Sequence, residues 1–411
     1  MNRVVVTGMG VTSPIGNSIP EFWESLKDGK VGIGPITKFD PEGTGVSLAA
    51  EIKDFPSDKY FAKKDLRKMD SFSAYGIYAT LEALAMSNLN FEDEDMDRVG
   101  VIVGSGVGGL VTMEEQIIKM SEKGPERISP LFIPMVISNM AAGNIAHRLG
   151  AKGICTSITT ACASGTNCIG EAFRNIKHGY SDVIFAGGTE SSICEIGIGG
   201  FASLTALTKS DDQYRASIPF DKERNGFVMG EGAGVIVLES LEHAKARGAN
   251  ILGEIVGYGS NCDAYHMTSP LPDGSGAAKA MKLAINEAEI NPSEIGYINA
   301  HGTSTVANEK GEAKAIENVF GDNSNVLVSS SKSMTGHLLG AAGGIEAIAT
   351  LLSLENQYVT VTAGTKEIDD DMNINVVLNE GVSHSFDYAL SNSLGFGGHN
   401  AVVCFKRYIE D

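Results

Sequence analysis

The stretch TSITTACASGTNCIG, residues 156–170, places Cys162 among small and hydroxylic side chains. The residues before the cysteine are typical of a short strand, and apolar side chains recur at helical spacing over residues 169–176. The stretch therefore predicts a strand, a turn of small residues and a helix that begins near Ala163.

The same order of elements recurs in NVLVSSSKSMTGHLLGAAGGIEAIATLL, residues 325–352. Strand-like and amphipathic segments alternate along the whole chain, which is typical of an α/β fold with mostly parallel, buried strands. Another strand-like opening, ILGEIVGYG, follows a charged, glycine-containing segment near residue 250. The long period predicts two related α/β halves, residues 1–250 and 251–411, which pack tightly because no linker-like segment separates them.

Composition narrows the class of protein. The 411 residues are 43% hydrophobic and 20% charged, which suffices for a large core, and the net charge of −19 argues against binding nucleic acid. The first residues lack a signal-peptide pattern, and no apolar run is long enough to span a membrane. We therefore expect a cytoplasmic protein. Its six cysteines include no CxxC pair and are expected to be reduced thiols rather than disulfides or zinc ligands.

Cys162 is the candidate nucleophile. A helix that starts just after it would direct unpaired N–H groups and a positive dipole end toward the sulfur, which favours the thiolate. The small side chains at residues 163–165 leave room for a substrate to approach. The alternative interpretation of this stretch alone is a buried cysteine that only packs.

Two histidines favour catalysis. His301, in HGTST, follows a predicted strand, and Lys332 and His337 lie at the strand-to-helix junction that matches the cysteine stretch. If the halves are related by pseudo-symmetry, these turns converge on one site. The set is sparse for a metal but suits acyl transfer, in which a thiolate attacks and neutral imidazoles donate to oxyanions. The glycine-rich GMGVTSPIG and GSGVGG lack the complete dinucleotide fingerprint, so no nicotinamide cofactor is expected.

Five motifs occur in register along the chain: TACASGT, PFDKERNGFVMGEGAG, HGTST, KSMTGHLLGAAG and NSLGFGGHN. Together they resemble the β-ketoacyl-acyl-carrier-protein synthases, the condensing enzymes of bacterial type II fatty acid synthesis. The resemblance runs from GMGVTSPIGN near the start to GFGGHNAVVCFKR near the end. It implies the thiolase fold, in which two pseudo-symmetric α/β halves form a five-layered α-β-α-β-α arrangement, usually as a homodimer.

The resemblance also implies a decarboxylative condensation with residues in defined roles. Cys162 would take the acyl chain from acyl-carrier protein, and its backbone N–H and that of Phe396 would form the oxyanion hole. His301 and His337 would assist decarboxylation of malonyl-carrier protein, with Lys332 setting the electrostatics around them. Phe396 would also act as a gate. No cofactor is implied, because the acyl groups arrive on the phosphopantetheine of the carrier.

Further positions are assigned by the same resemblance. Glu312 and Glu346 would support the histidines. The implied substrate-binding residues are Thr303, Thr305, Val107 and Gly397. A basic helix face would dock the acidic carrier with the residues Lys64, Arg67, Lys68 and Arg127. Some relatives hold a monovalent cation near the positions of Asn299, Glu312, Glu346 and Asn392.

The chain departs from the commonest family pattern in several places. Glu309 stands where an aspartate is usual, Val107 replaces a frequent isoleucine, and Thr205 stands where some members place a carrier-docking arginine. The segment TVTAGT, residues 360–365, replaces a proline-containing one. None of these changes affects the cysteine and histidine set, so they bear on chain length, unsaturation preference and docking rather than on the reaction.

Three related activities are the alternatives. A thiolase uses a second cysteine as base where this chain has histidines, and a chain-length-factor subunit lacks the nucleophile that Cys162 provides. A discrete polyketide-type ketosynthase shares all five motifs and stays the main alternative. We expect the fatty-acid enzyme because 411 residues hold no fused domains.

Overall fold

The computed structural model describes residues 1–321 and 325–410; residues 322–324 and 411 of the predicted second half lie outside the described part. Within it, the main sheet has eleven strands in the order β12-β10-β9-β14-β15-β8-β1-β7-β6-β4-β5. The strands from the first half are β1 (Val4–Thr12), β4 (Val99–Gly104), β5 (Cys155–Thr156), β6 (Val183–Glu190) and β7 (Gly232–Ser240). Those from the second are β8 (Gly253–Cys262), β9 (Ile295–Asn299), β10 (Leu327–Ser329), β12 (Asn375–Val376), β14 (Tyr388–Gly395) and β15 (His399–Lys406).

The strand pairing follows the same scheme twice. In the first set β4 lies parallel to β5 and β6, while β6 and β1 both pair antiparallel with β7. In the second set β9 lies parallel to β10 and β14, while β14 and β8 both pair antiparallel with β15. The two sets meet where Val4–Val6 of β1 pair with residues 253–255 of β8. The repeated scheme is that of two pseudo-symmetric halves.

The expectation of mostly parallel strands is wrong, because five of the ten strand pairings in the described main sheet are antiparallel. All strands of the central part are buried on both faces, so their side chains do not alternate between apolar and polar. Continuous apolar runs were therefore uninformative about strand direction. The NSLGFGGHN segment forms the tight β14–β15 turn, with Gly397 and Gly398 at φ of 88° and 76°.

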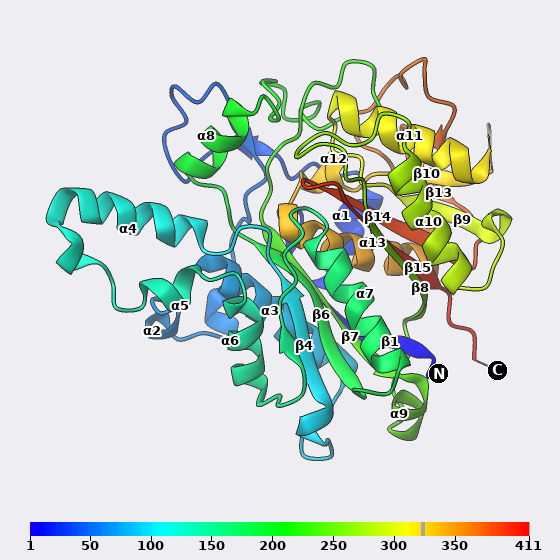
Figure 1. Cartoon of the computed structure of the whole chain (residues 1–411), viewed down its shortest axis with the longest axis horizontal. Helices are drawn as coiled ribbons and strands as arrows, with labels where there is room; N and C mark the ends of the chain where they lie inside the picture. Colours follow the sequence, from blue (N-terminus) through cyan, green and yellow to red (C-terminus); the bar gives the residue numbers. More distant parts are fainter. Residues whose placement is uncertain (322–324, 411) are drawn as a thin grey trace.

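Helices form three layers around these two sets of strands. On the first set, α3 (Ser71–Ser87) and α6 (Met140–Leu149) pack on the outer face, and α10 (Ser275–Glu287), with α11 (Val306–Phe320) against it, covers the second set. Between the sets lie α7 (Ser164–Lys177) and α13 (Ala342–Asn356), which contact strands of both. Figure 1 shows α7 and α13 at the centre, with α3 and α6 toward one side and α10 and α11 toward the other. The five-layered arrangement is thus confirmed.

Glycines let the two central helices approach to backbone contact. A Cβ at Gly165 of α7 would lie 2.8 Å from the Gly344 nitrogen of α13, and one at Gly343 would lie 2.2 Å from Thr166 Oγ1. No larger residue fits without moving a backbone. This close packing brings the N-terminal ends of both helices to one place, next to the turns that carry Cys162 and His337.

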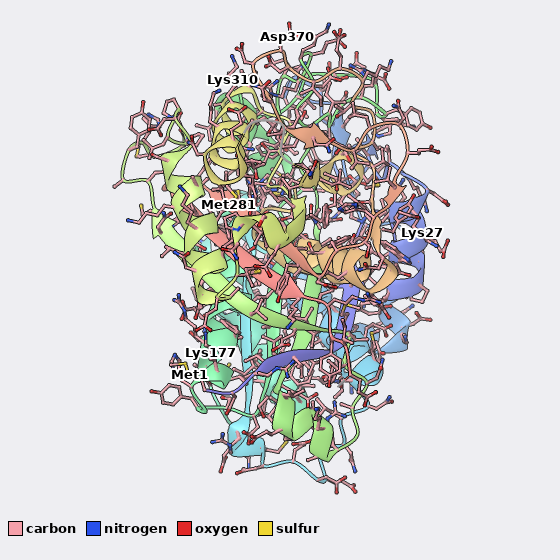
Figure 2. All side chains as sticks on the ribbon, turned by 90° about the vertical axis from the view of Figure 1, so that its right-hand side faces the viewer. Met1, Lys27, Lys177, Met281, Lys310 and Asp370 are labelled. Atoms are coloured by element: carbon pink, nitrogen blue, oxygen red, sulfur yellow. The ribbon has the colours of Figure 1, made fainter. Side chains whose placement is uncertain are left out.

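The remaining elements lie around the layers. They are the helices α1 (Ile19–Lys27), α2 (Lys63–Leu66), α4 (Leu110–Lys123), α5 (Phe132–Val136), α8 (Glu195–Ser203), α9 (Leu241–Ala246) and α12 (Lys332–Thr335), and the short strands β2 (Gly34–Pro35), β3 (Leu48–Ala49), β11 (Tyr358–Val359) and β13 (Val382–Ser383). In Figure 2 the labelled Lys27, Lys310 and Asp370 lie at the periphery, whereas the buried Met281 lies inside. In the part of the chain described here, no helix is both long and apolar enough for a membrane crossing.

The predicted basic helix face is shorter than expected. Helix α2 ends at Leu66, so Arg67 caps it and Lys68 lies beyond it. The helix cannot continue because Asp70 is the N-cap of α3, where its carboxylate accepts from the backbone N–H of Phe72. Lys64, Arg67 and Lys68 are nevertheless exposed.

Candidate active site

Cys162 lies between β5 and α7 in a strained turn that hydrogen bonds hold in place. The strand is only two residues long, and an irregular extended segment leads from it to Ala161, which has a φ of 50° despite its side chain. The Ser164 hydroxyl accepts from the Thr160 N–H at 2.9 Å and donates to the Ala161 carbonyl at 2.6 Å. Helix α7 then begins at Ser164, as the sequence predicts, so its free N–H groups lie beside the cysteine.

Asn167 of α7 and residues of the second half hold this turn from behind. The Asn167 amide donates to Thr160 Oγ1 at 2.7 Å, and the buried Tyr258 hydroxyl of β8 donates to Asn167 Oδ1 at 2.6 Å. At the end of β14, a Cβ on Gly395 would lie 2.6 Å from the Thr160 carbonyl oxygen. Sequence reasoning missed Asn167 and Tyr258, because neither belongs to a recognisable motif.

His301 follows β9 and is held by its backbone. Its N–H donates to Glu312 Oε1 at 2.7 Å, and that of Gly302 donates to Glu312 Oε2 at 2.8 Å. Lys332 Nζ lies 3.4 Å from His301 Nδ1. An ammonium group can only donate, so Nδ1 accepts and the imidazole proton resides on Nε2.

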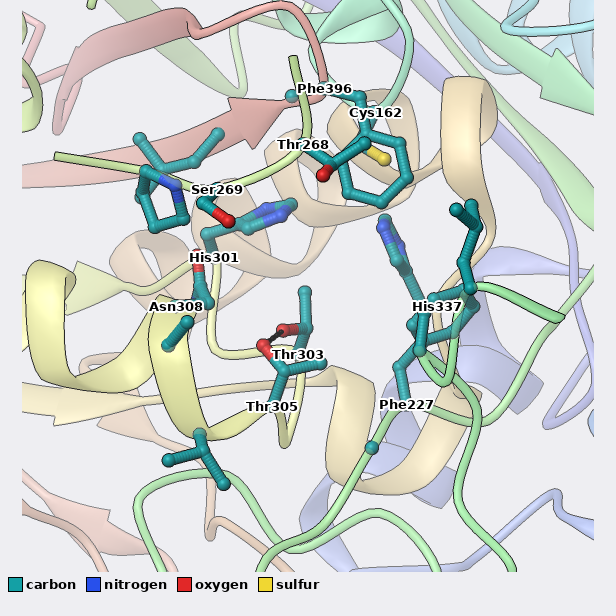
Figure 3. A pocket seen from close by; sticks show the side chains of 18 of the residues that line it. Cys162, Phe227, Thr268, Ser269, His301, Thr303, Thr305, Asn308, His337 and Phe396 are labelled. Atoms are coloured by element: carbon teal, nitrogen blue, oxygen red, sulfur yellow. Dashed lines mark hydrogen bonds between the residues drawn. The ribbon is translucent and has the colours of Figure 1, made fainter. Parts of the chain in front are cut away.

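His337 faces His301 across the cavity. The two ring centroids lie 5.2 Å apart, nearly perpendicular at 88°, and the Phe227 ring lies 5.2 Å from His337 on its other side. The His337 N–H donates to the Val228 carbonyl at 2.7 Å, which anchors the turn. Figure 3 shows both imidazoles pointing into the space beside Cys162.

Burial keeps the three reacting groups uncharged. It lowers the pKa of His301 and of His337 well below the ordinary value, and the nearby Lys332 lowers both further. Burial raises the pKa of Cys162 to about 12, although Lys332 and the Phe396 N–H act in the opposite direction. Burial therefore opposes the thiolate that the helix start favours. The thiol must pass its proton to a neighbour as it attacks.

Behind the histidines lies a buried charged layer. Lys332 forms an ion pair with Glu346, both are almost fully buried, and desolvation raises the pKa of the Glu346 and Glu312 carboxyls. Three buried oxygens nearby have no hydrogen-bond partner among the described residues: Asn299 Oδ1, Glu346 Oε2 and Asn392 Oδ1. Oxygen donors of this kind fit the monovalent cation that some relatives hold near these positions.

The predicted catalytic residues open onto one cavity of about 370 Å³. Its lining comes from both halves and includes Cys162, His301, His337, Thr303, Thr305 and Phe396. The Phe396 ring lies 6.2 Å from that of Phe201 and is half-buried at the cavity wall. The cavity therefore brings together all predicted catalytic residues except Lys332, which supports the histidines from behind.

Other predicted positions lie outside the cavity lining. Val107 is 40% exposed at the surface of the single chain, and Gly397 is exposed in the β14–β15 turn. Arg127 is exposed as well, in a short turn of helix after α4. Thr205, singled out as a departure from the family pattern, lines the cavity.

A segment after β8 was missed by the sequence analysis. Thr268 and Ser269 line the cavity close to His301 (Figure 3). The segment is tied to the β14–β15 turn, because the Gly397 N–H donates to the Met267 carbonyl at 2.7 Å and Asn400 Nδ2 donates to Asp263 Oδ1 at 2.7 Å. The polar run DAYHMTS, shortly after the predicted strand ILGEIVGYG, was the available signal.

Comparisons with known proteins give the same picture over the whole chain. The family "Beta-ketoacyl synthase, N-terminal domain" matches residues 1–244, and "Beta-ketoacyl synthase, C-terminal domain" matches residues 252–366. The 3-oxoacyl-[acyl-carrier-protein] synthase 2 of Staphylococcus aureus (strain N315) is 49% identical over 99% of this chain and 98% of its own length. The protein of the same name from Synechocystis sp. is 46% identical over the same shares.

Solved structures agree. A β-ketoacyl synthase from Burkholderia phymatum STM815 is 34% identical, with a TM-score of 0.93 over the full length of both chains. The ketosynthase complex described as a type II PKS acyl-carrier protein with its ketosynthase bound to the hexaketide gives a TM-score of 0.91 at 34% identity, covering 99% of this chain and 100% of that one. These matches over nearly the whole chain show that it belongs to the β-ketoacyl synthase family.

Proposed function

We propose that the protein condenses malonyl-acyl-carrier protein with an acyl group bound to Cys162, giving β-ketoacyl-carrier protein and CO2 in fatty acid elongation. The observation that carries the proposal is one buried thiol that shares a cavity with two neutral imidazoles. The names of relatives that are 46–49% identical over nearly the whole chain support the same reaction. No redox step is involved, so the reaction needs no electron-carrying cofactor.

In the first half-reaction, the Cys162 sulfur attacks the acyl thioester carbonyl and transfers its proton to a neighbouring imidazole. The backbone N–H groups of Cys162 and Phe396 are the proposed oxyanion hole. Collapse of the tetrahedral adduct breaks the bond to the carrier's sulfur, which leaves with the proton. The α7 N-terminus stabilises negative charge at this place throughout.

In the second half-reaction, the malonyl thioester carbonyl accepts hydrogen bonds from the imidazoles. His301 is prepared for this, because Lys332 binds Nδ1 and leaves the proton on Nε2. Loss of CO2 leaves its electron pair as an enolate whose oxygen the imidazoles stabilise. The enolate carbon attacks the acyl carbonyl on Cys162, and the Cys162 sulfur leaves and regains a proton.

The pantetheine arm would lie against Thr303 and Thr305. Their hydroxyls are 3.0 Å apart at the cavity wall. A buried ionic group fixes this loop: Glu309 accepts from the Thr303 N–H at 2.9 Å, and Arg224 donates to the carbonyl of Thr305 at 3.3 Å. Glu309 Oε2 also lies 3.4 Å from Arg224 Nε, so the departure from aspartate leaves the loop well supported.

The same chemistry would serve a polyketide-type ketosynthase, which is the second candidate. The similarity to a solved type II PKS ketosynthase favours it. Higher identity to the fatty-acid synthases, at 46–49% against 34%, favours elongation of fatty acids. The two candidates differ in the number of malonyl extensions without intervening reduction.

The proposed partner is acyl-carrier protein, docked through the exposed Lys64, Arg67, Lys68 and Arg127. Charge reversal at the first three should raise KM for carrier-bound substrates and weaken its salt dependence, since it removes electrostatic attraction. Turnover of a small pantetheine thioester is the control and should not change. The cytoplasm is the proposed location, and all six cysteines are free thiols, as a reducing compartment favours.

A second copy of the chain is the other proposed partner. Strand β5 is an exposed sheet edge, and α4 projects from the body of the molecule in Figure 1. Exposed apolar side chains lie on α4, on or just after α5, and in the segments next to β4 and β5: Val107, Ile117, Ile118, Ile133, Ile137 and Ile154. Pairing of two β5 edges across a two-fold axis would cover these side chains. Ile133→Asp should convert a dimer into monomers in sedimentation; an unchanged mass would contradict this interface.

The decisive experiment is an elongation assay. Purified protein is mixed with malonyl-carrier protein and with acyl-carrier proteins whose acyl chains differ in length and unsaturation. The masses of the products are measured by mass spectrometry. One extension per acyl group, absent in Cys162→Ala, supports the proposed reaction. Multiple unreduced extensions would establish the polyketide candidate, and no extension with any acyl group would reject both.

A further inference from the structure

Glu190, the last residue of β6, is a buried carboxylate that the proposed reaction does not use. Its exposed fraction is 0%, and every hydrogen bond described for it comes from an uncharged donor. The donors are Gly106 N at 2.7 Å, Gly340 N at 3.0 Å, Ser105 Oγ at 3.0 Å, Val107 N at 3.3 Å and Ser192 Oγ at 3.3 Å. A carboxylate offers about four lone-pair sites, so five donors saturate it.

These donors come from segments that surround the reacting thiol. Residues 105–107 form the loop after β4, whereas Gly340 follows His337 by three positions in the other half. Contact between the segments is close: a Cβ on Gly106 would lie 2.8 Å from Glu190 Oε2 and 3.4 Å from both the Ala161 carbonyl oxygen and the Gly340 nitrogen. The carboxylate thus joins the loop of Val107, the turn of His337 and the turn of Cys162.

We propose that Glu190 is a positioning residue, whose carboxylate holds the Val107 loop and the His337 turn in register with Cys162 and thereby influences which acyl chains are accepted. The part of this proposal that concerns acyl chains rests on the proposed function. The part that concerns register is independent of it. Glutamine would not substitute, because its amide group would point N–H toward backbone N–H.

The charge of Glu190 provides a readout that a purely structural residue would not have. Glu190 raises the pKa of Cys162, as does the more distant Glu346, whereas Lys332 and the Phe396 N–H lower it. His301 and His337 at the cavity are neutral, and Asp263 also lines it. Removing the Glu190 charge should therefore make the Cys162 thiol more acidic.

The test compares Glu190→Gln with a matched control, Glu239→Gln. Glu239 is equally buried, but its partners Arg247, His243 and Thr7 lie away from the cavity. Three quantities are measured: the iodoacetamide alkylation rate of Cys162 against pH, kcat/KM for acyl-carrier proteins of graded length, and the melting temperature. In Glu190→Gln the alkylation curve should shift to lower pH, and kcat/KM should fall on the order of tenfold, unequally across chain lengths.

The control should lose thermal stability while both other quantities stay at wild-type values. A Glu190→Gln protein that behaves in the same way would overturn the proposal. If that variant does not fold, Ser105→Ala decides, since it keeps the charge and removes one link: length preference should change while the alkylation curve stays in place. Alkylation needs no carrier substrate. If the alkylation curve shifts but the protein does not elongate acyl groups, the proposed function is rejected while the part of the proposal that concerns register is kept.

Discussion

The turn of Cys162 and the turn of His337 have the same backbone design in the two halves of the molecule. Helices α7 and α13 begin two residues after Cys162 and Gly340 respectively. One residue before each of these positions, Ala161 and Leu339 have φ angles of 50° and 48°. The duplicated fold has therefore kept the geometry of the junction, including its strain.

The side chains at matching positions have diverged. Where the first half has the proposed nucleophile Cys162, the second has Gly340, whose N–H donates to Glu190 instead. Six residues further on, Cys168 packs in the apolar core while Glu346 pairs with Lys332. The first half thus supplies an uncharged thiol at a helix start, and the second supplies the imidazoles and charges that control it. Duplication provided a second turn that was free to take a different role.

The largest effect is expected from replacing Cys162, with Cys168 as the control cysteine. Cys162→Ala should lower acyl transfer on the order of 10⁶-fold, the scale of losing a covalent nucleophile, without changing the melting temperature by much. Cys168→Ala, in the buried helix, should leave acyl transfer near wild type and lower stability instead. Acyl-enzyme formation is followed by intact mass. Retained acylation of Cys162→Ala would contradict the assignment of the nucleophile.

The second prediction tests whether the two turns serve different steps of the reaction. Replacing either His301 or His337 by alanine should leave Cys162 able to accept an acyl group, because the oxyanion hole is formed by backbone N–H groups and the remaining imidazole can take the proton of the thiol. Condensation should fall by roughly 10²- to 10³-fold, the scale of one lost oxyanion donor. Single-turnover loading and 14CO2 release from labelled malonyl-carrier protein measure the steps separately. Equal loss of both steps would show that the turns do not divide the reaction.

Much of this comparison could be predicted from the sequence, because the relevant patterns are local. Small residues before a helical period marked both junctions, and the likeness of the two stretches placed Cys162 and His337 at one site. Strand direction could not be predicted, since buried strands show no alternation. The helix start that favours a thiolate is visible in the sequence, whereas the depth of burial that opposes the thiolate is not.

The supporting contacts were also beyond the sequence. Tyr258 reaches Asn167 over 91 positions, and the Gly340 N–H reaches Glu190 over 150. Such pairs depend on how the halves pack, and each residue alone reads as an ordinary core position. The resemblance to a family names catalytic residues, but only geometry shows what holds them. For Val107 the resemblance predicts a place in the acyl pocket, but in the single chain this side chain is exposed at the surface. Its predicted role therefore requires another surface to cover it.

The third prediction concerns the charges of the second half. Lys332→Met strands the buried Glu346 carboxylate and should cost about 3–5 kcal/mol of unfolding free energy. The double variant with Glu346→Gln should recover much of that loss without recovering condensation. Lys332 also lowers the pKa of His301, so in the double variant the acid limb of the activity profile should move to higher pH. Denaturant unfolding and pH–rate profiles test both parts; an unmoved acid limb would contradict the electrostatic role.

The smallest expected effect is on the pH dependence of stability. It distinguishes the neutral cavity histidines from His243, a charged histidine remote from the cavity. His243 lies between Glu239 and Glu94, with Arg247 also bound to Glu239, and the carboxylates raise its pKa. Its stabilising charge is fully present below the unfolded pKa of about 6.5 and is lost as pH rises through the folded pKa. The stability difference between wild type and His243→Gln should therefore shrink as pH rises.

His337 should show the opposite slope. Its folded pKa lies well below about 6.5, so below that pH the unfolded chain binds a proton that the folded chain does not. As pH falls, wild type should consequently lose unfolding free energy relative to His337→Phe. Over the same pH range it should gain unfolding free energy relative to His243→Gln. Unfolding free energies at pH 5.5 to 8 measure both slopes. Parallel slopes would mean that His337 is charged in the folded protein, which would contradict the neutral imidazole proposed for the reaction.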